Sequence, residues 1–284
     1  MNAFPKLYEE IIFDASGFAV FGNALGPAQV AEARSELTQI FDQPPDASLG
    51  DSALVRTHVL ARFPRLRRLI LQPKVIEPMR LLLGENFVIL PDNTATHSRY
   101  SGWHKDTHGM ERFGFNFIHD PEYLCATAVI YLQDNEAEYG GGLEVVPGSH
   151  AEPDRYRHAE NPATHGRLYK LGDAAYPPEA MELVGSHAGD LVLFNDKLDH
   201  SGAWPRSVPR PADLYDAPPP AVPPEKRKFM FSMAGMPNNR HVQSYLDYYK
   251  FLKTKFHEYK AMGRPYDQET LALARSLGFT LLSQ

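Results

Sequence analysis

The chain has 284 residues, of which 43% are hydrophobic, and this is enough for one sizeable core. Its net charge of −6 and its scattered basic residues argue against a nucleic-acid-binding protein, which usually carries a concentrated basic face. The single cysteine, Cys125, excludes an internal disulfide framework and is expected to be a buried thiol. No secretory leader is recognisable, and no stretch approaches the roughly 20 apolar residues of a membrane span. We therefore expect a cytoplasmic protein that does not bind membranes.

The N-terminal part, residues 1–85, shows the residue spacing of helices. Pro27 stands at a favoured first-turn position, and apolar residues then recur every three or four positions as far as Phe41. The same spacing returns over residues 75–83, and Gly84 is a fitting helix end. We expect this part to be helical.

The middle of the chain, about residues 86–235, contains short apolar runs bounded by Gly, Pro, Asn or Asp. Because no helices alternate with these runs, a doubly wound parallel sheet is disfavoured. The pattern predicts a mainly β fold with flanking helices, in which a double-sheet jelly roll forms the core. The expected strands are Phe87–Leu90, Ala126–Leu132, Leu143–Val146, Asp190–Phe194 and Phe229–Met233.

Two further segments complete the predicted single domain, residues 1–284. The segment 207–225 is rich in proline and cannot join a sheet interior, so it is either a disordered insertion or a lid over a site. The C-terminal part, residues 238–284, is expected to be helical. Its first helix has apolar residues at helical spacing from Val242 to Tyr259. Asn238 or Asn239 is expected to cap this helix and Gly263 to end it.

Most large enzyme classes lack their sequence motif here. The chain contains no Gly-x-Gly-x-x-Gly dinucleotide loop, no phosphate loop, no His-Glu-x-x-His pair and no Gly-x-Ser-x-Gly elbow.

Three residues can form a metal site. His104 and Asp106 are two positions apart, so in a strand their side chains point to the same side and can hold one divalent ion. Alone, this pair is common by chance. His200 follows a buried strand that begins after Gly189, and it is a plausible third ligand. Two histidines and one carboxylate on one face leave coordination positions open, as in non-haem iron oxygenases.

The glycine-rich turn and strand of residues 140–150 supply a third motif, in which His150 has a loop or capping role. These motifs, in this order and after the opening Gly17–Leu25, resemble the phytanoyl-CoA hydroxylase-like family of 2-oxoglutarate oxygenases over roughly Gly17 to Ala234. The resemblance implies a double-stranded β-helix fold, which is a cupin-like jelly roll. It also implies Fe(II), 2-oxoglutarate and O2, with ascorbate supporting activity. By position, it gives the iron ligands as His104, Asp106 and His200.

The same resemblance implies an arginine that binds the distal carboxylate of 2-oxoglutarate, at the start of the strand after the second histidine. Arg227 stands there, beyond the proline-rich segment, with Arg206 and Arg210 as alternatives. Ser201 is expected to assist.

The reaction that the resemblance implies is hydroxylation of an unactivated C–H bond, with release of succinate and CO2. The polar and aromatic residues around the motif favour a small polar or anionic substrate. Candidate substrate contacts are His108, His97 and Arg99, although each of them can equally be a surface or loop residue. The aromatic segment 110–123 is expected either to wall the substrate pocket or to pack in the core.

Two rival functions use the same residues. A zinc-dependent hydrolase or lyase can use the same three ligands, and a jelly roll can be a binding protein without catalysis. The sequence leaves open the identity of the substrate, an outcome of hydroxylation, desaturation or cyclisation, and a monomeric or homodimeric state.

Overall fold

The computed structural model describes residues 8–152, 178–211, 214, 217–256, 259 and 264–283. Among these residues the strands form two sheets. The larger has the order β1-β7-β4-β9-β3-β10, with β2 also paired to β3, and the smaller has the order β6-β5-β8. All pairs are antiparallel except β10 with β3. The strands are β1 (Phe18–Phe21), β2 (Val55–Thr57), β3 (Val88–His97), β4 (Ala126–Tyr131), β5 (Leu143–Val145), β6 (Glu182–Leu183), β7 (Leu191–Asn195), β8 (His200–Gly202), β9 (Phe229–Met236) and β10 (Thr280–Leu281).

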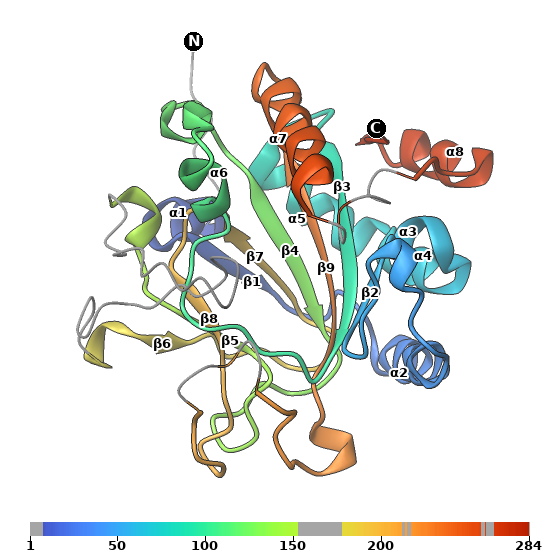
Figure 1. Ribbon diagram of the computed structural model, residues 1–284, viewed down its shortest axis with the longest axis vertical. Coiled ribbons are helices and arrows are strands. Elements are labelled where there is room, and N and C mark those ends of the chain that lie inside the picture. The colour runs from blue at the N-terminus through green and yellow to red at the C-terminus, as the bar shows by residue number, and fades with distance from the viewer. Residues whose placement is uncertain are drawn as a thin grey trace.

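The helices between residues 27 and 83 cover one side of the larger sheet, whereas β5, β6 and β8 lie on its other side, where the helix His241–Lys255 also packs against Ala234 and Met236 at one end (Figure 1). This arrangement confirms the predicted mainly β jelly roll with helices outside. The helices are α1 (Tyr8–Ser16), α2 (Pro27–Asp42), α3 (Val59–Arg62), α4 (Pro64–Ile70), α5 (Pro73–Leu83), α6 (His108–Arg112), α7 (His241–Lys255) and α8 (Gln268–Ser276). No helix in the described part of the chain is long and apolar enough to cross a bilayer.

Helix ends follow local chemistry. Helix α2 begins with Pro27 in its first turn, and the N–H of Gly26 donates to Oε1 of Gln29 at 2.9 Å. Helix α5 ends before Gly84, which has the positive φ of 84° that glycine adopts without strain. At the start of α7 the N-cap residue is Arg240 and not one of the two asparagines, although Oδ1 of Asn239 accepts from the N–H of His241 at 2.9 Å. Gly263 lies outside the described residues.

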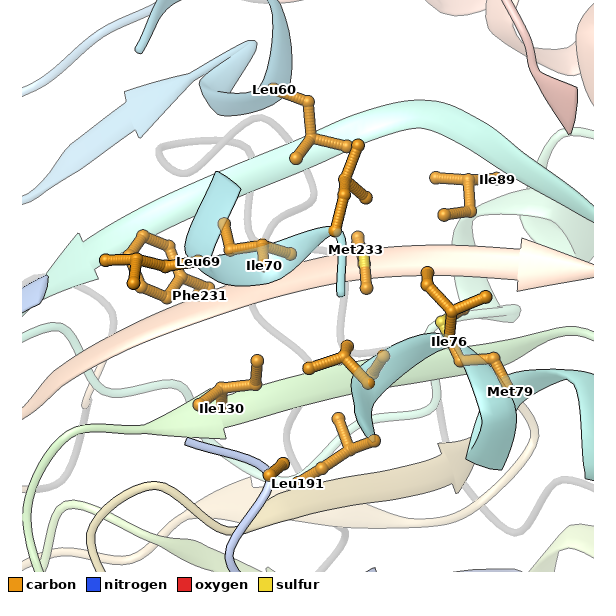
Figure 2. Close-up of a cluster of buried hydrophobic side chains, with 14 of the residues drawn as sticks. Leu60, Leu69, Ile70, Ile76, Met79, Ile89, Ile130, Leu191, Phe231 and Met233 are labelled. Carbon is orange, nitrogen blue, oxygen red and sulfur yellow. The ribbon is translucent and has the colours of Figure 1, made fainter. Parts of the chain in front are cut away.

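The alternation of side chains along β4 and β9 separates the helix-covered core from the other face of the sheet. Ile130, Phe231 and Met233 pack against side chains of the helices, as Figure 2 shows. Their sequence neighbours Val129 and Met230 lie in a separate apolar cluster on the opposite face. The larger sheet therefore separates the helix-side core from the space between the two sheets.

Several elements differ from the predicted ones. The range 1–85 contains β1 and β2 besides its helices, and the C-terminal range contains β10. Strand β3 runs on to His97 instead of ending at Leu90, with a register shift between Ile89 and Asn93. Its second half carries polar residues that line the space between the sheets, so an apolar run does not mark it. Cys125 is buried and free, as predicted.

The described residues of the proline-rich segment 207–225 contain one short 3-10 helix, Pro224–Lys226. Leu214 in this segment is buried against Tyr100 and Trp204. Residues 212, 213, 215 and 216 of this segment lie outside the described residues.

Candidate metal centre

His104, Asp106 and His200 converge, with ligand atoms all within 4.8 Å of one another. Oδ1 of Asp106 lies 3.5 Å from Nε2 of His104 and 3.7 Å from Nε2 of His200. Both separations are below the roughly 4.2 Å that two metal–ligand bonds of about 2.1 Å can span. The three residues are therefore placed to hold one divalent ion, and their role as its ligands stays a prediction.

The backbone holds the two histidines together. His104 and His200 form an antiparallel bridge in which each residue's N–H donates to the other's carbonyl, at 2.9 and 3.0 Å. The ring centroids are 4.2 Å apart. Asp106 lies two residues after His104, in the turn that leads into α6, and its Oδ1 reaches the same point.

Hydrogen bonds to backbone carbonyls orient both imidazoles. Nδ1 of His104 is 2.7 Å from the carbonyl oxygen of Gly102, and Nδ1 of His200 is 3.0 Å from that of Leu198. Each Nδ1 is thereby assigned the proton, so the Nε2 lone pairs face Asp106. Metal-binding histidines are usually held in this way, with the second nitrogen donating to a carbonyl or carboxylate.

The charges of the three groups depend on one another. Burial and the neighbouring His104 lower the pKa of His200 to about 4, so this imidazole is neutral near pH 7. Burial also acts to lower the pKa of His104, but the hydrogen bond and charge of Asp106 outweigh it and raise this pKa. Burial acts to raise the pKa of Asp106, but His200 and His104 outweigh it, so this pKa is lowered and the carboxylate is charged. A carboxylate beside a neutral imidazole is a suitable ligand set for a cation.

The site opens into a cavity of ≈ 290 Å³ between the two sheets. Its walls mix aromatic, aliphatic and hydroxyl side chains with two cationic ones, Arg99 and Lys228. Both sheets contribute, since Met230 belongs to β9 and Leu143 to β5. A partly apolar cavity with a few converging polar groups is the usual form of a small-molecule site.

Lys228, which the sequence pattern did not single out, directly precedes β9 and lines the cavity. It alternates with Met230 and Ser232, which line the cavity too. Its side chain is buried, and Nζ lies 5.1 Å from the centroid of the Tyr100 ring. Burial and the charge of Arg99 lower the pKa of Lys228 to about 7.

Arg227 does not line the cavity. Arg227 alternates with Lys228, so its side chain is on the same side as that of Phe229, away from the cavity, and it is exposed. The period of two would have identified Lys228, had the strand's register been known.

The other proposed anchors lie away from the cavity. Ser201 is buried, but its Oγ donates to the carbonyl of Ser101 at 3.1 Å and accepts from Arg210 at 3.0 Å. Arg210 also pairs with Glu144 at 3.0 Å, and Arg206 is exposed. Ser201 alternates with its neighbour His200, so its side chain points away from the metal ligands.

Among the candidate substrate contacts, Arg99 lines the cavity and the two histidines do not. His97 stacks on Phe229 with centroids 4.5 Å apart, and His108 is buried in α6. The aromatic segment 110–123 packs against α7, with Phe115 and Tyr248 centroids 5.2 Å apart, which favours the packing alternative.

Comparison with solved structures finds the same fold at low identity. EvdO2 from Micromonospora carbonacea var. aurantiaca, crystallised with 2-oxoglutarate, has a TM-score of 0.56 at 16% identity, with 82% of this chain and 92% of that chain covered. HygX from Streptomyces hygroscopicus, crystallised with iron, has a TM-score of 0.54 at 17% identity, with coverages of 83% and 88%. SnoN, an α-ketoglutarate-dependent epimerase from nogalamycin biosynthesis, has a TM-score of 0.52 at 19% identity, with coverages of 81% and 79%.

A search of curated proteins found no match. The family model described as phytanoyl-CoA dioxygenase (PhyH) matches residues 13–207, which is more than half of the chain and contains all three predicted ligands. The chain therefore belongs to the phytanoyl-CoA dioxygenase (PhyH) family, and its His-Asp-His site fits the iron and 2-oxoglutarate chemistry of such enzymes.

Proposed function

We propose that this protein is an Fe(II)- and 2-oxoglutarate-dependent oxygenase that hydroxylates an unactivated C–H bond of a small polar or anionic metabolite. The observation that carries the proposal is the triad at the cavity, with two Nε2 atoms and one carboxylate oxygen directed at a common point. Membership of the PhyH family supports the assignment.

His104, Asp106 and His200 would hold the iron and leave its remaining positions to ligands from the cavity. Bound iron and 2-oxoglutarate supply the oxidising chemistry, in which O2 is consumed, 2-oxoglutarate becomes succinate and CO2, and the substrate gains a hydroxyl group. The backbone bridge between the histidines keeps the ligand geometry fixed before the metal binds.

Lys228 is the proposed anchor for the distal carboxylate of 2-oxoglutarate. Its ammonium is buried at the cavity wall, where an ionic hydrogen bond to a carboxylate faces little competition from water. A bound carboxylate would also offset the burial that lowers the pKa of Lys228. Arg227, the residue favoured by the sequence, would have to turn from an exposed position to reach the cavity.

The remaining cavity walls serve the substrate. Val129, Phe194 and Met230 supply an apolar surface that excludes water from the reacting groups. Arg99 supplies a second cation, which suits a polar or anionic substrate group.

Two alternatives use the same site. The ligands would accept zinc for hydrolytic or lyase chemistry, but membership of the PhyH family favours iron and 2-oxoglutarate. Two similar solved structures are named as an epimerase and a carbocyclase. The second alternative is therefore epimerisation or ring closure, neither of which adds an oxygen atom to the product.

The test is a substrate panel with matched anionic and neutral metabolites, read by succinate release and mass spectrometry of the product. The proposal expects succinate with Fe(II), ascorbate and O2 and a product heavier by one oxygen, with anionic members preferred. Turnover that requires zinc and leaves 2-oxoglutarate unconsumed would show the hydrolase or lyase instead.

A further inference from the structure

Lys105 lies between two of the metal ligands but points away from them. Because alternate residues of an extended chain point in opposite directions, its side chain enters the protein behind the site. Its Nζ donates to the carbonyls of Ser149 and Glu152 at 2.8 and 3.2 Å, and lies 3.9 Å from Oδ2 of Asp199. The Lys105 and Asp199 side chains are 5% and 0% exposed, so this ion pair is buried.

Asp199 directly precedes the third ligand, His200, and its backbone is fixed on both sides. Its N–H donates to Oγ of Ser149 at 2.9 Å, and its carbonyl accepts from the N–H of Val146 at 3.0 Å. The segment after His104 and the segment before His200 are therefore both bonded to the short turn around Ser149. The two segments are joined beside the cavity by the backbone bridge between His104 and His200. The Lys105–Asp199 ion pair joins the same segments a second time, on the side away from the cavity.

A buried ion pair is weak evidence of a contribution to stability, because desolvation of the two charges offsets their attraction. It does fix geometry, since both charges must stay close together or remain uncompensated in a poorly solvated place. We propose that the Lys105–Asp199 pair positions the two histidine-bearing segments at the separation that the metal ion requires. Lys105 is on this account a positioning residue, and the inference rests on the triad being the metal site.

Charge and positioning predict opposite effects when Lys105 is neutralised. By Coulomb's law alone, removing a positive charge near a cation site tightens metal binding. Loss of positioning weakens it instead. In the double variant Lys105→Met/Asp199→Asn the two opposite charges disappear together, so the direct effect of charge largely cancels and the effect of positioning remains.

The experiment is anaerobic titration of the metal-free full chain with Fe(II), and separately with Co(II), whose visible spectrum reports the ligand geometry. The variants are Lys105→Met, the double variant and Lys197→Met. Lys197 is the control, because it is also a partly buried lysine close to the site. Burial and the nearby charge of Lys105 lower its pKa. None of the described hydrogen bonds joins its side chain to the turn around Ser149. Urea unfolding of each variant shows whether the variant is folded under the conditions of the titration.

We expect the double variant to bind both ions about 10-fold more weakly, the low end of the 10- to 100-fold known for partners that orient metal ligands, with an altered Co(II) spectrum. Lys197→Met should bind within about two-fold of the wild type, since the loss of one partly solvated charge has a small effect. If the folded double variant binds like the wild type, or if Lys197→Met weakens binding equally, positioning by the pair is refuted. If Lys105→Met alone does not fold, the charge-balanced double variant decides. A wild-type chain that binds neither ion would refute the metal site itself, which is a different result.

Discussion

Replacing Lys228 by Met removes the ammonium and keeps a side chain of similar shape in the cavity wall. A hydrogen bond between charged groups contributes about 1.5–3 kcal/mol, which corresponds to roughly 10- to 150-fold in binding. With a pKa of about 7, Lys228 is only about half charged at pH 7 before its ligand binds. This halves the expected effect, so we predict a rise of roughly 5- to 75-fold in the apparent KM for 2-oxoglutarate.

Initial rates of succinate formation at saturating Fe(II) and varied 2-oxoglutarate measure this KM. Lys228→Arg keeps the charge and should recover part of the affinity. Arg227→Met is the matched control, because it removes the neighbouring charge from an exposed position and should leave KM unchanged. A rise in KM with Arg227→Met and none with Lys228→Met would move the anchor to Arg227. No rise in either variant would refute the reasoning from strand alternation.

Three further predictions concern the same site. Burial and Arg99 lower the pKa of Lys228 to about 7, so its charged form is lost as pH rises through 7. In initial-rate measurements, the KM of the wild type for 2-oxoglutarate should therefore increase above pH 7, whereas the KM of Lys228→Met should not change with pH. The hydroxyl of Thr127 lies 3.4 Å from Oδ2 of Asp106 and 3.0 Å from Oδ1 of Asp196. In anaerobic titration, Thr127→Val should therefore weaken Fe(II) binding about 10-fold, and Thr127→Ser should retain it. Equal binding by both variants would show that this hydroxyl does not orient Asp106. Hydrogen exchange in residues 212–221 should slow when 2-oxoglutarate and substrate are bound, as expected for a lid; equal exchange in both states, with unchanged kinetics after replacement by a Gly-Ser linker, would identify an inert insertion.

The fold was predictable where the local pattern is strong. Strand β4 was expected at Ala126–Leu132 because its apolar run is bounded and rich in β-branched residues, and it occurs at Ala126–Tyr131. Strand β1, with four residues, and strand β10, with two, depend on pairing with β7 and β3, which are distant in sequence. Such short segments carry too little local signal to be recognised.

The convergence of the three candidate metal ligands was predictable, whereas the residues that line the cavity were not. The spacing of His104 and Asp106 places them together in any extended segment, whereas the choice between Arg227 and Lys228 depends on strand register. A slip of one residue moves every side chain to the other face of a sheet, and the proline-rich segment before β9 gives no register. The partner of Lys105 was equally invisible, because Asp199 reaches it only through the tertiary fold.

Succinate formation by metal-free protein reconstituted with Fe(II) tests the central claim most directly, in the wild type and in His104→Ala, Asp106→Ala and His200→Ala. His187→Gln is the control, because this histidine is exposed and lies 3.6 Å from Asp134, outside the cavity. The account predicts 2-oxoglutarate turnover in the wild type and in His187→Gln, and none in the three ligand variants while they remain folded. Full turnover in any one of the ligand variants would contradict the assignment of His104, Asp106 and His200 as the iron site.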